Sequence, residues 1–233
     1  MTSVETVLGL LEEHADSEQL KGMERYAIVT DKRMGVSVPD LRKIARMIGK
    51  DHQLATHLWK TGIAEARILA SMVDDPLQVT EQQMDEWVAD FNSWDICDQV
   101  CMNLFGESRY IRAKIYEWAA REAEFEKRAG FASIAVLAWR DKSATDESFL
   151  EFLPLILSGA EDSRNFVKKA VSWALRNIGK RSPYLRIAVL EFVPRLEAMD
   201  IKPAVWIARQ TTRDLNSQAT MRRMAKMAAR DAV

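Results

Sequence analysis

Trp94 and Asp98 combine an aromatic ring and a carboxylate at a spacing that could serve chemistry. They follow Asn92 and Ser93, either of which can cap a helix, and Asp95 would lie in the first turn, where the helix dipole favours an anion. Because positions four apart share one face of an α-helix, the indole and the carboxylate would face the same way. On spacing alone, a salt bridge is the simpler role for Asp98, so the pair needs support from elsewhere in the chain.

Few catalytic templates fit the remaining residues. The sequence has no Gly-rich phosphate loop, no Gly-x-Ser-x-Gly elbow and no His-Glu-x-x-His motif. The three histidines are scattered and complete no metal site with the two cysteines, so we expect neither a metal nor a cofactor. A carboxylate, aromatic rings and cations suffice for the loss of a leaving group that is already cationic. An N3- or N7-alkylated purine is such a group, and a carboxylate can stabilise the oxocarbenium-like transition state of its departure.

A second aromatic residue, Trp173, lies between two cations. Lys169 and Arg176 stand four residues before and three residues after it, on the same helical face. Cations that grip phosphates beside a ring that packs on a sugar would suit a sugar-phosphate backbone. The same pattern also fits a core tryptophan whose neighbours extend to solvent.

The charges are unevenly distributed along the chain. The net charge is −1, yet residues 1–108 hold 10 Lys and Arg against 19 Asp and Glu, and residues 109–233 hold 23 against 15. Such a chain can present a basic face to a polyanion, although the two halves could instead neutralise each other. Cys97 and Cys101 are one helical turn apart, and we expect them to be reduced and buried in a cytoplasmic protein. No secretory signal and no long apolar run is present, so we expect no membrane association.

Helical periodicity runs through almost the whole chain, and no segment alternates as a strand would. We therefore predict an all-α fold in a single domain over residues 1–233. The predicted helices cover residues 2–14, 17–29, 38–49, 52–60, 64–73, 80–91, 94–106, 110–121, 125–139, 145–157, 163–179, 183–196, 203–210 and 215–229.

The helices also repeat in pairs. The second helix of each pair begins near residues 63, 94, 125, 163 and 201, a spacing like that of HEAT-type arrays. Cations recur early in these helices, at Arg67, Arg128, Lys168 and Lys169, although the helix dipole opposes cations there. Stacked pairs would align them along one concave, basic face that suits a polyanion.

Four stretches of the chain resemble the AlkD-type DNA alkylation repair glycosylases, an all-helical HEAT-like family. They are Met23–Tyr26 with Met34–Pro39, Ser93–Asp98, Phe125–Ala129 and Phe166–Arg176. The stretches occur in the family's order and extend over most of the chain, from about residue 17 to residue 186. The resemblance implies a HEAT-like solenoid of antiparallel helix pairs.

The resemblance also implies roles for individual residues. Asp98 matches the catalytic aspartate, Trp94 and Trp173 match two tryptophans that cradle the deoxyribose, and Arg128 matches an arginine of the same cleft. The positions that match DNA contacts are Tyr26, Lys169 and Arg176. The family excises N3- and N7-alkylpurines from double-stranded DNA without base flipping, unlike most glycosylases. We expect a monomer with this activity.

The sequence departs from the family's pattern at two places, and two functions other than a glycosylase also fit it. A single Trp94 follows Ser93 where some relatives have two tryptophans, and the basic helix at residues 221–227 has no assigned counterpart, so we interpret it as a cap on the array. The first alternative is a non-catalytic binder of damaged or branched DNA, and the second is a HEAT-type protein-interaction scaffold. The preferred adduct, small or bulky, does not follow from the sequence.

Overall fold

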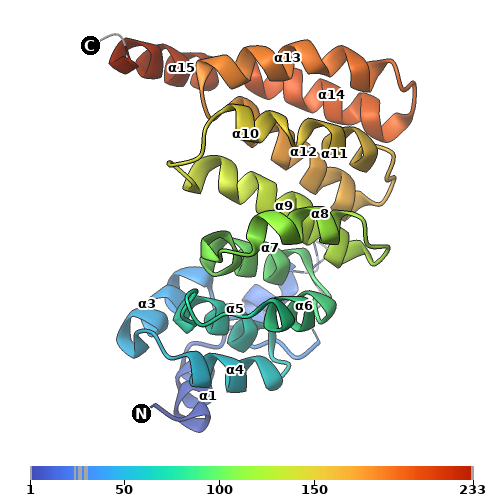
Figure 1. Ribbon diagram of the computed structural model, residues 1–233. Coiled ribbons are helices and arrows are strands. Elements are labelled where there is room, and N and C mark those ends of the chain that lie inside the picture. The colour runs from blue at the N-terminus through green and yellow to red at the C-terminus, as the bar shows by residue number, and fades with distance from the viewer. Residues whose placement is uncertain (1, 24, 26–27, 29–30, 232–233) are drawn as a thin grey trace. The chain divides into compact units, whose positions relative to one another are not determined.

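All regular structure in the described residues is helical, as predicted. The computed structural model describes residues 2–23, 25, 28 and 31–231. The chain divides into two compact units, residues 1–111 and 112–233, and each is a stack of helices (Figure 1). A single domain spanning both units stays a prediction. No helix of the described residues is long and apolar enough to cross a membrane.

The first unit is organised around α5. Its helices are α1 (Val4–Glu13), α2 (Ser17–Met23), α3 (Val38–Ile48), α4 (His52–Lys60), α5 (Ala64–Val73), α6 (Glu81–Ala89) and α7 (Trp94–Asn103), followed by the short 3₁₀ helix η2 (Phe105–Glu107). The helix α5 is buried on nearly all sides and packs against α3, α4 and α7. Thus α5 and α7, the second helices of two successive pairs, lie side by side.

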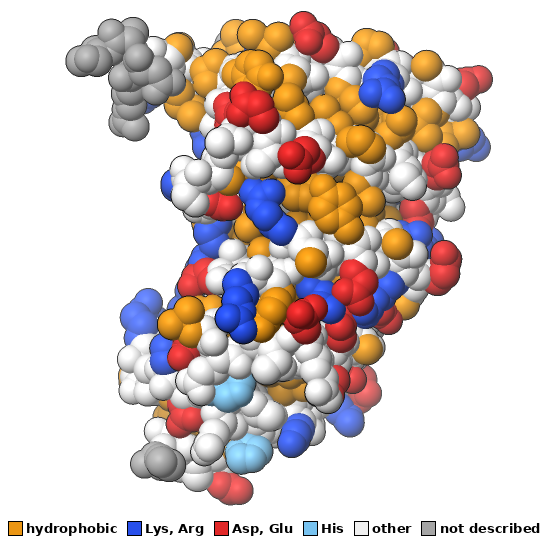
Figure 2. Space-filling view, viewed as in Figure 1, with side chains coloured by type: hydrophobic (Ala, Val, Ile, Leu, Met, Phe, Trp, Pro, Cys, Tyr) orange, Lys and Arg blue, Asp and Glu red, His pale blue; other side chains and the backbone are white. Residues whose placement is uncertain are grey.

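The second unit is organised around α12. Its helices are α8 (Ile111–Ala119, which starts at the last residue of the first unit), α9 (Glu124–Arg140), α10 (Glu147–Leu150), α11 (Leu153–Gly159), α12 (Asn165–Gly179), α13 (Pro183–Glu197), α14 (Lys202–Leu215) and α15 (Gln218–Asp231). The helix α12 packs against α9 on one side and α14 on the other. The helix α13 lies outside this layer, and hydrophobic side chains gather over it in Figure 2.

Capping residues set several of the predicted helix starts. Thr80 accepts the amide of Gln83 at the start of α6, as the capping-box pattern predicts, and Ser37 accepts the amide of Asp40 at the start of α3. Gly49 ends α3 with φ +78°, a conformation that glycine adopts without strain. The predicted bounds of α4 and α5 match the structure at both ends.

Several predicted helices were wrong in extent. The helix predicted over residues 17–29 ends at Met23, and Ile28 is not helical. Residues 145–157 contain parts of two short helices, α10 and α11, because Pro154 has no amide hydrogen to donate to the carbonyl oxygen of Leu150. The chain turns at Glu151 and Phe152, and Pro154 lies in the first turn of α11, where no amide donor is needed. The helix α14 continues beyond Gln210 to Leu215, since buried Thr211 contributes to the core despite its modest helix propensity.

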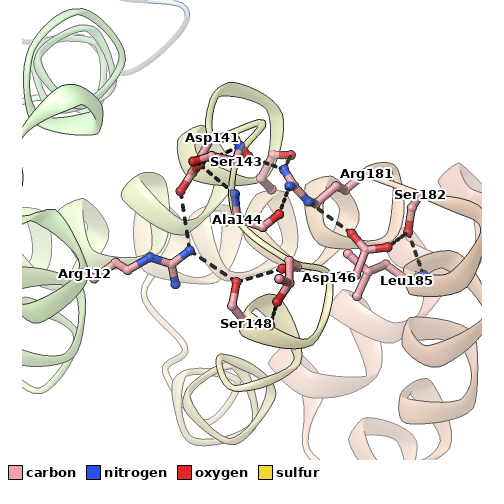
Figure 3. A network of polar contacts seen from close by, with 11 residues as sticks. Arg112, Asp141, Ser143, Ala144, Asp146, Ser148, Arg181, Ser182 and Leu185 are labelled. Atoms are coloured by element: carbon pink, nitrogen blue, oxygen red, sulfur yellow. Dashed lines mark hydrogen bonds and ion pairs between the residues drawn. The ribbon is translucent and has the colours of Figure 1, made fainter.

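A polar network fixes the loop between α9 and α10 (Figure 3). Arg181 donates hydrogen bonds to the carbonyl oxygens of Ala138, Asp141 and Ala144 and pairs with Asp146 at 3.2 Å. Asp146 also accepts a hydrogen bond from Ser182, the N-cap of α13. The starts of α9 and α12 are further apart in sequence than those of α5 and α7 mainly because α9 has 17 residues and α5 has 10.

Candidate functional site

The start of α7 presents Trp94 and Asp98 away from the core. The side chains of Ile96, Cys97, Val100 and Cys101 form the buried face of the helix, whereas Trp94 and Asp98 are only partly buried. Both cysteines are buried free thiols, as predicted. The arrangement leaves an indole and a carboxylate together at the surface of one helical turn.

A buried ion pair holds this helix start. The guanidinium of Arg33 donates to both carboxylate oxygens of Asp95, each at 2.8 Å, and its side chain is 2% exposed. Ser93 Oγ also donates to Asp95 Oδ1. Ser93 is the N-cap residue of α7, but its side chain accepts no amide hydrogen bond, so the prediction that this side chain caps the amides was wrong.

The loop that carries Arg33 is itself fixed by Glu65 of α5. The buried carboxylate of Glu65 accepts the amides of Met34 at 3.1 Å and Gly35 at 2.9 Å. Gly35 has φ +79°, and a Cβ atom there would lie 2.1 Å from the carbonyl oxygen of Asp16, so only glycine fits. Sequence reasoning missed Arg33 and Glu65, although Met34-Gly35 belongs to a stretch that carries the family resemblance.

Arg67, predicted to contact DNA, is bound within the protein. Its guanidinium donates to Asp90 Oδ2 at 3.0 Å and lies 4.9 Å from the centre of the Trp59 ring. Trp59 stacks on Trp87 with 4.0 Å between ring centres, and both are buried. A DNA contact by Arg67 would have to displace this carboxylate and stays a prediction. Tyr26, also predicted to contact DNA, lies outside the described residues.

In the second unit, Arg128 joins α9 to α12. Its side chain is buried, and Nη1 donates to the carbonyl oxygen of Phe166 at 2.6 Å. The rings of Phe125 and Phe166 contact each other with 5.4 Å between centres, and Lys127 Nζ lies 3.7 Å from the carboxylate of Asp162. The cationic stretch at the start of α9 therefore anchors the first turn of α12.

The exposed face of α12 carries the predicted aromatic and cationic group. Trp173 is half-buried, and Lys169 is exposed, so the tryptophan is not enclosed in the core. Arg176 is half-buried and its Nη1 lies 3.2 Å from Asp214 of α14. The side chain of Lys168 points toward α14, where its Nζ lies 4.9 Å from the centre of the Trp206 ring. These side chains place positive charge beside an accessible indole.

The second helices of the pairs, which we call the inner helices, are α5, α7, α9, α12 and α14, and their N-cap side chains do not cap them. The N-cap side chains of α5, α7, α9, α12 and α14 accept no amide hydrogen bond, and neither do those of α10 and α11, whereas α3, α4, α6 and α13 are capped by side chains. A helix start without a side-chain cap leaves amide donors and a positive dipole end for an anion or for water, but at α12 the first-turn amide of Phe166 already donates to Glu124 Oε1 at 3.4 Å. Among the described residues, no group of three or more acidic, histidine or cysteine side chains could hold a metal ion.

The paired helices define a HEAT-like helical-repeat protein. Comparison with known proteins goes further: the chain belongs to the DNA alkylation repair enzyme family, whose model matches residues 7–233. A search of curated proteins found no match.

A solved structure shares the fold. It is described as "a new family of proteins related to the HEAT-like repeat DNA glycosylases with affinity for branched DNA structures". The TM-score is 0.74 at 21% identity, and the match covers 82% of each chain.

Proposed function

We propose that this protein is a monofunctional DNA glycosylase that excises cationic N3- and N7-alkylated purines from duplex DNA. The arrangement at the start of α7 carries the proposal, because Trp94 and Asp98 share an accessible face of a helix whose start is fixed by the buried Arg33–Asp95 pair. Membership of the DNA alkylation repair family supports the substrate class.

The proposed reaction needs little acid catalysis. The bond between the deoxyribose C1′ and purine N9 breaks, and its electron pair leaves with the base, which was cationic and departs neutral. Positive charge then develops on the sugar, where the Asp98 carboxylate stabilises it or orients the incoming water. The water adds to C1′ and loses a proton to solvent, which leaves an abasic site. Because the base departs without a protonating residue, no pocket for a flipped base is required.

The cations and aromatic rings supply binding in this proposal. In the second unit, Lys168, Lys169 and Arg176 contact phosphates and the Trp173 ring packs on a sugar of the DNA backbone. In the first unit, the Trp94 ring packs on the sugar that the Asp98 carboxylate faces. Arg128 holds the first turn of α12 in place through its bond to Phe166. The start of α14, whose N-cap side chain accepts no hydrogen bond, adds amide donors that favour an anionic backbone.

A comparison of leaving groups tests the proposed chemistry. Purified protein should release 7-methylguanine and 3-methyladenine from methylated duplex DNA, measured by mass spectrometry of the free bases. It should not release hypoxanthine, because that purine is uncharged and needs protonation before it can depart. Equal release of charged and uncharged bases would contradict a mechanism without an acid.

A non-catalytic binder of branched DNA is the second candidate, favoured by the description of the structural neighbour. It predicts tighter binding to three-way or four-way junctions than to alkylated duplex of equal length, with no release of any base. Electrophoretic mobility shifts on matched junction and duplex DNA, beside the base-release assay, distinguish the two functions.

A further inference from the structure

The exposed face of α14 repeats that of α12. Both helices follow the pattern Lys-x₃-Trp-x₂-Arg-x₃-Lys/Arg, and side chains at that spacing fall on one helical face. The α12 stripe consists of Lys169, Trp173, Arg176 and Lys180, and the α14 stripe consists of Lys202, Trp206, Arg209 and Arg213.

The two helices that carry the stripes run side by side in the same direction. Lys168, early in α12, contacts the ring of Trp206, early in α14. Near the other end, Lys180 Nζ lies 2.9 Å from Asp214, and a Cβ atom at Gly179 would lie 2.6 Å from Leu215 Cδ1. Contacts that follow the same order along both helices show that α12 and α14 are parallel neighbours, as their packing also indicates.

The α14 stripe is more available for an anion than the α12 stripe. Arg176 and Lys180 share the carboxylate of Asp214 at 3.2 and 2.9 Å, so half of the α12 stripe is partly neutralised. In the part of the chain that the structure describes, Lys202 and Arg209 are exposed and form no ion pair, and Arg213 bonds only to the neutral side chain of Gln210.

The opposite side of α14 accounts for its packing. Ala204, Ile207, Ala208, Thr211 and Leu215 are buried against the rest of the unit, so the stripe is not needed to fill the core. The half-buried Trp206 is instead covered on one side by the Lys168 ammonium, a cation–π contact that fixes the ring while leaving the helix face open.

We propose that the α14 stripe is a second binding track for the DNA backbone, beside the α12 stripe. This inference rests on DNA being the ligand, as in the proposed function, but not on base excision. Lys202, Arg209 and Arg213 contact phosphates, and Trp206 packs on a sugar between them. Because packed helices lie about 10 Å apart and a strand rises about 3.4 Å per nucleotide, the α14 stripe contacts the backbone about three nucleotides from the α12 stripe.

Salt dependence tests the track, because each phosphate contact lowers the slope of log K against log salt by about 0.9. The variant Lys202→Gln/Arg209→Gln/Arg213→Gln should reduce the magnitude of this slope by about 2 to 3 and weaken binding at least 10-fold at low salt. The control Lys60→Gln/Lys142→Gln/Arg195→Gln removes the same charge from exposed cations outside the inner helices and should bind like the wild type. The measurement is a fluorescence anisotropy titration of duplex DNA at several salt concentrations.

The outcomes separate this inference from the glycosylase proposal. Equal slopes for the two triple variants would overturn the track, because binding would then depend only on overall charge. A wild type that binds no DNA would also overturn it, because there would be no contact to explain. A wild type that binds DNA through the stripe but releases no base would leave the track standing and refute the glycosylase. A second measurement uses Trp206→Phe and Trp206→Leu: the track requires the aromatic variant to bind at least several-fold more tightly than the aliphatic one.

Discussion

At the residue scale, two carboxylates three positions apart on α7 have different environments. Asp95 accepts hydrogen bonds from both Nη atoms of Arg33 and from the Ser93 hydroxyl, so it fixes the helix start. Asp98 lies on the accessible face with Trp94, where a carboxylate can face a substrate. We infer that Asp95 positions the helix and that Asp98 acts on the sugar.

Replacement of Arg33 should show how strongly the pair holds α7. The variant Arg33→Met leaves the mostly buried Asp95 carboxylate without its cation, so the free energy of unfolding should fall by about 3 kcal/mol. The double variant Arg33→Met/Asp95→Leu should recover much of this loss, because it removes the unpaired charge. Urea denaturation followed by circular dichroism measures both, and a single variant as stable as the wild type would refute the role of the pair.

The sequence could predict Trp94 and Asp98 but not Arg33. Residues on one helical turn share a face wherever the helix lies, so the pair follows from spacing. Arg33 lies 62 positions from Asp95 and comes from an irregular loop, and no local pattern links them. The contact depends on the fold of the loop around Glu65 and Gly35.

At the scale of elements, the start of α12 depends on a short ion-paired turn. Asp162 pairs with Arg164, the N-cap residue of α12, and Arg164 in turn donates to the carbonyl oxygen of Glu122 before α9. Hydrogen bonds from Arg164 lower the pKa of the Asp162 carboxyl, although burial partly opposes them. The turn thus ties the helix that carries Trp173 to its neighbour.

The pH dependence of stability should report this turn. A carboxyl whose pKa is lower in the folded than in the unfolded state stabilises the fold above its unfolded value of 3.8, and this contribution is lost as the pH falls through the folded value. Asp162→Asn should therefore lower the free energy of unfolding by about 1 kcal/mol at pH 7, a figure that allows for the partial exposure of Arg164. The loss should become progressively smaller below about pH 4. Unfolding free energies of wild type and variant across pH 3 to 7 test this. A constant difference would contradict it, and Glu161→Gln, at an exposed neighbour, is the control.

Close packing of α8 against α9 gives a second prediction for an element. A Cβ atom at Gly130 would lie 2.7 Å from the amide nitrogen of Ala119 and 3.0 Å from the carbonyl oxygen of Ile115, so Gly130→Ala forces the helices apart. We expect a loss of about 2 kcal/mol of unfolding free energy despite the better helix propensity of alanine. Gly9→Ala in α1 is the matched control, since its Cβ would meet no atom within 4 Å and it should stabilise by about 0.5 to 1 kcal/mol. Thermal unfolding measures the melting temperature of both variants, and equal shifts of the melting temperature from that of the wild type would refute the close contact.

Helix starts were predictable where a local signal exists. Thr80 and Ser37 mark α6 and α3 by their own hydrogen bonds, and these starts agree with the sequence. The end of α14 was not predictable from local propensity, because Thr211 is helical owing to its burial.

At the scale of the whole molecule, the sequence predicted the fold class and the family but not every use of its cations. Helical periodicity and the spacing of helix pairs identified a HEAT-like array, and the family model confirms the relationship over residues 7–233. Arg176 in the basic half pairs with Asp214, and Arg67 in the acidic half pairs with Asp90. A count of charges does not show which cations are already paired, because the partners are distant in sequence.

The central claim is that the Asp98 carboxylate accelerates loss of a cationic base. The most direct measurement is the single-turnover rate of 7-methylguanine release from a defined duplex by wild type and Asp98→Asn, with Glu13→Gln as a control at an exposed carboxylate. We predict a loss of about 100-fold or more for Asp98→Asn, with DNA binding within about 2-fold of the wild type, because the amide is nearly isosteric but uncharged. Release by Asp98→Asn at the wild-type rate would contradict the claim.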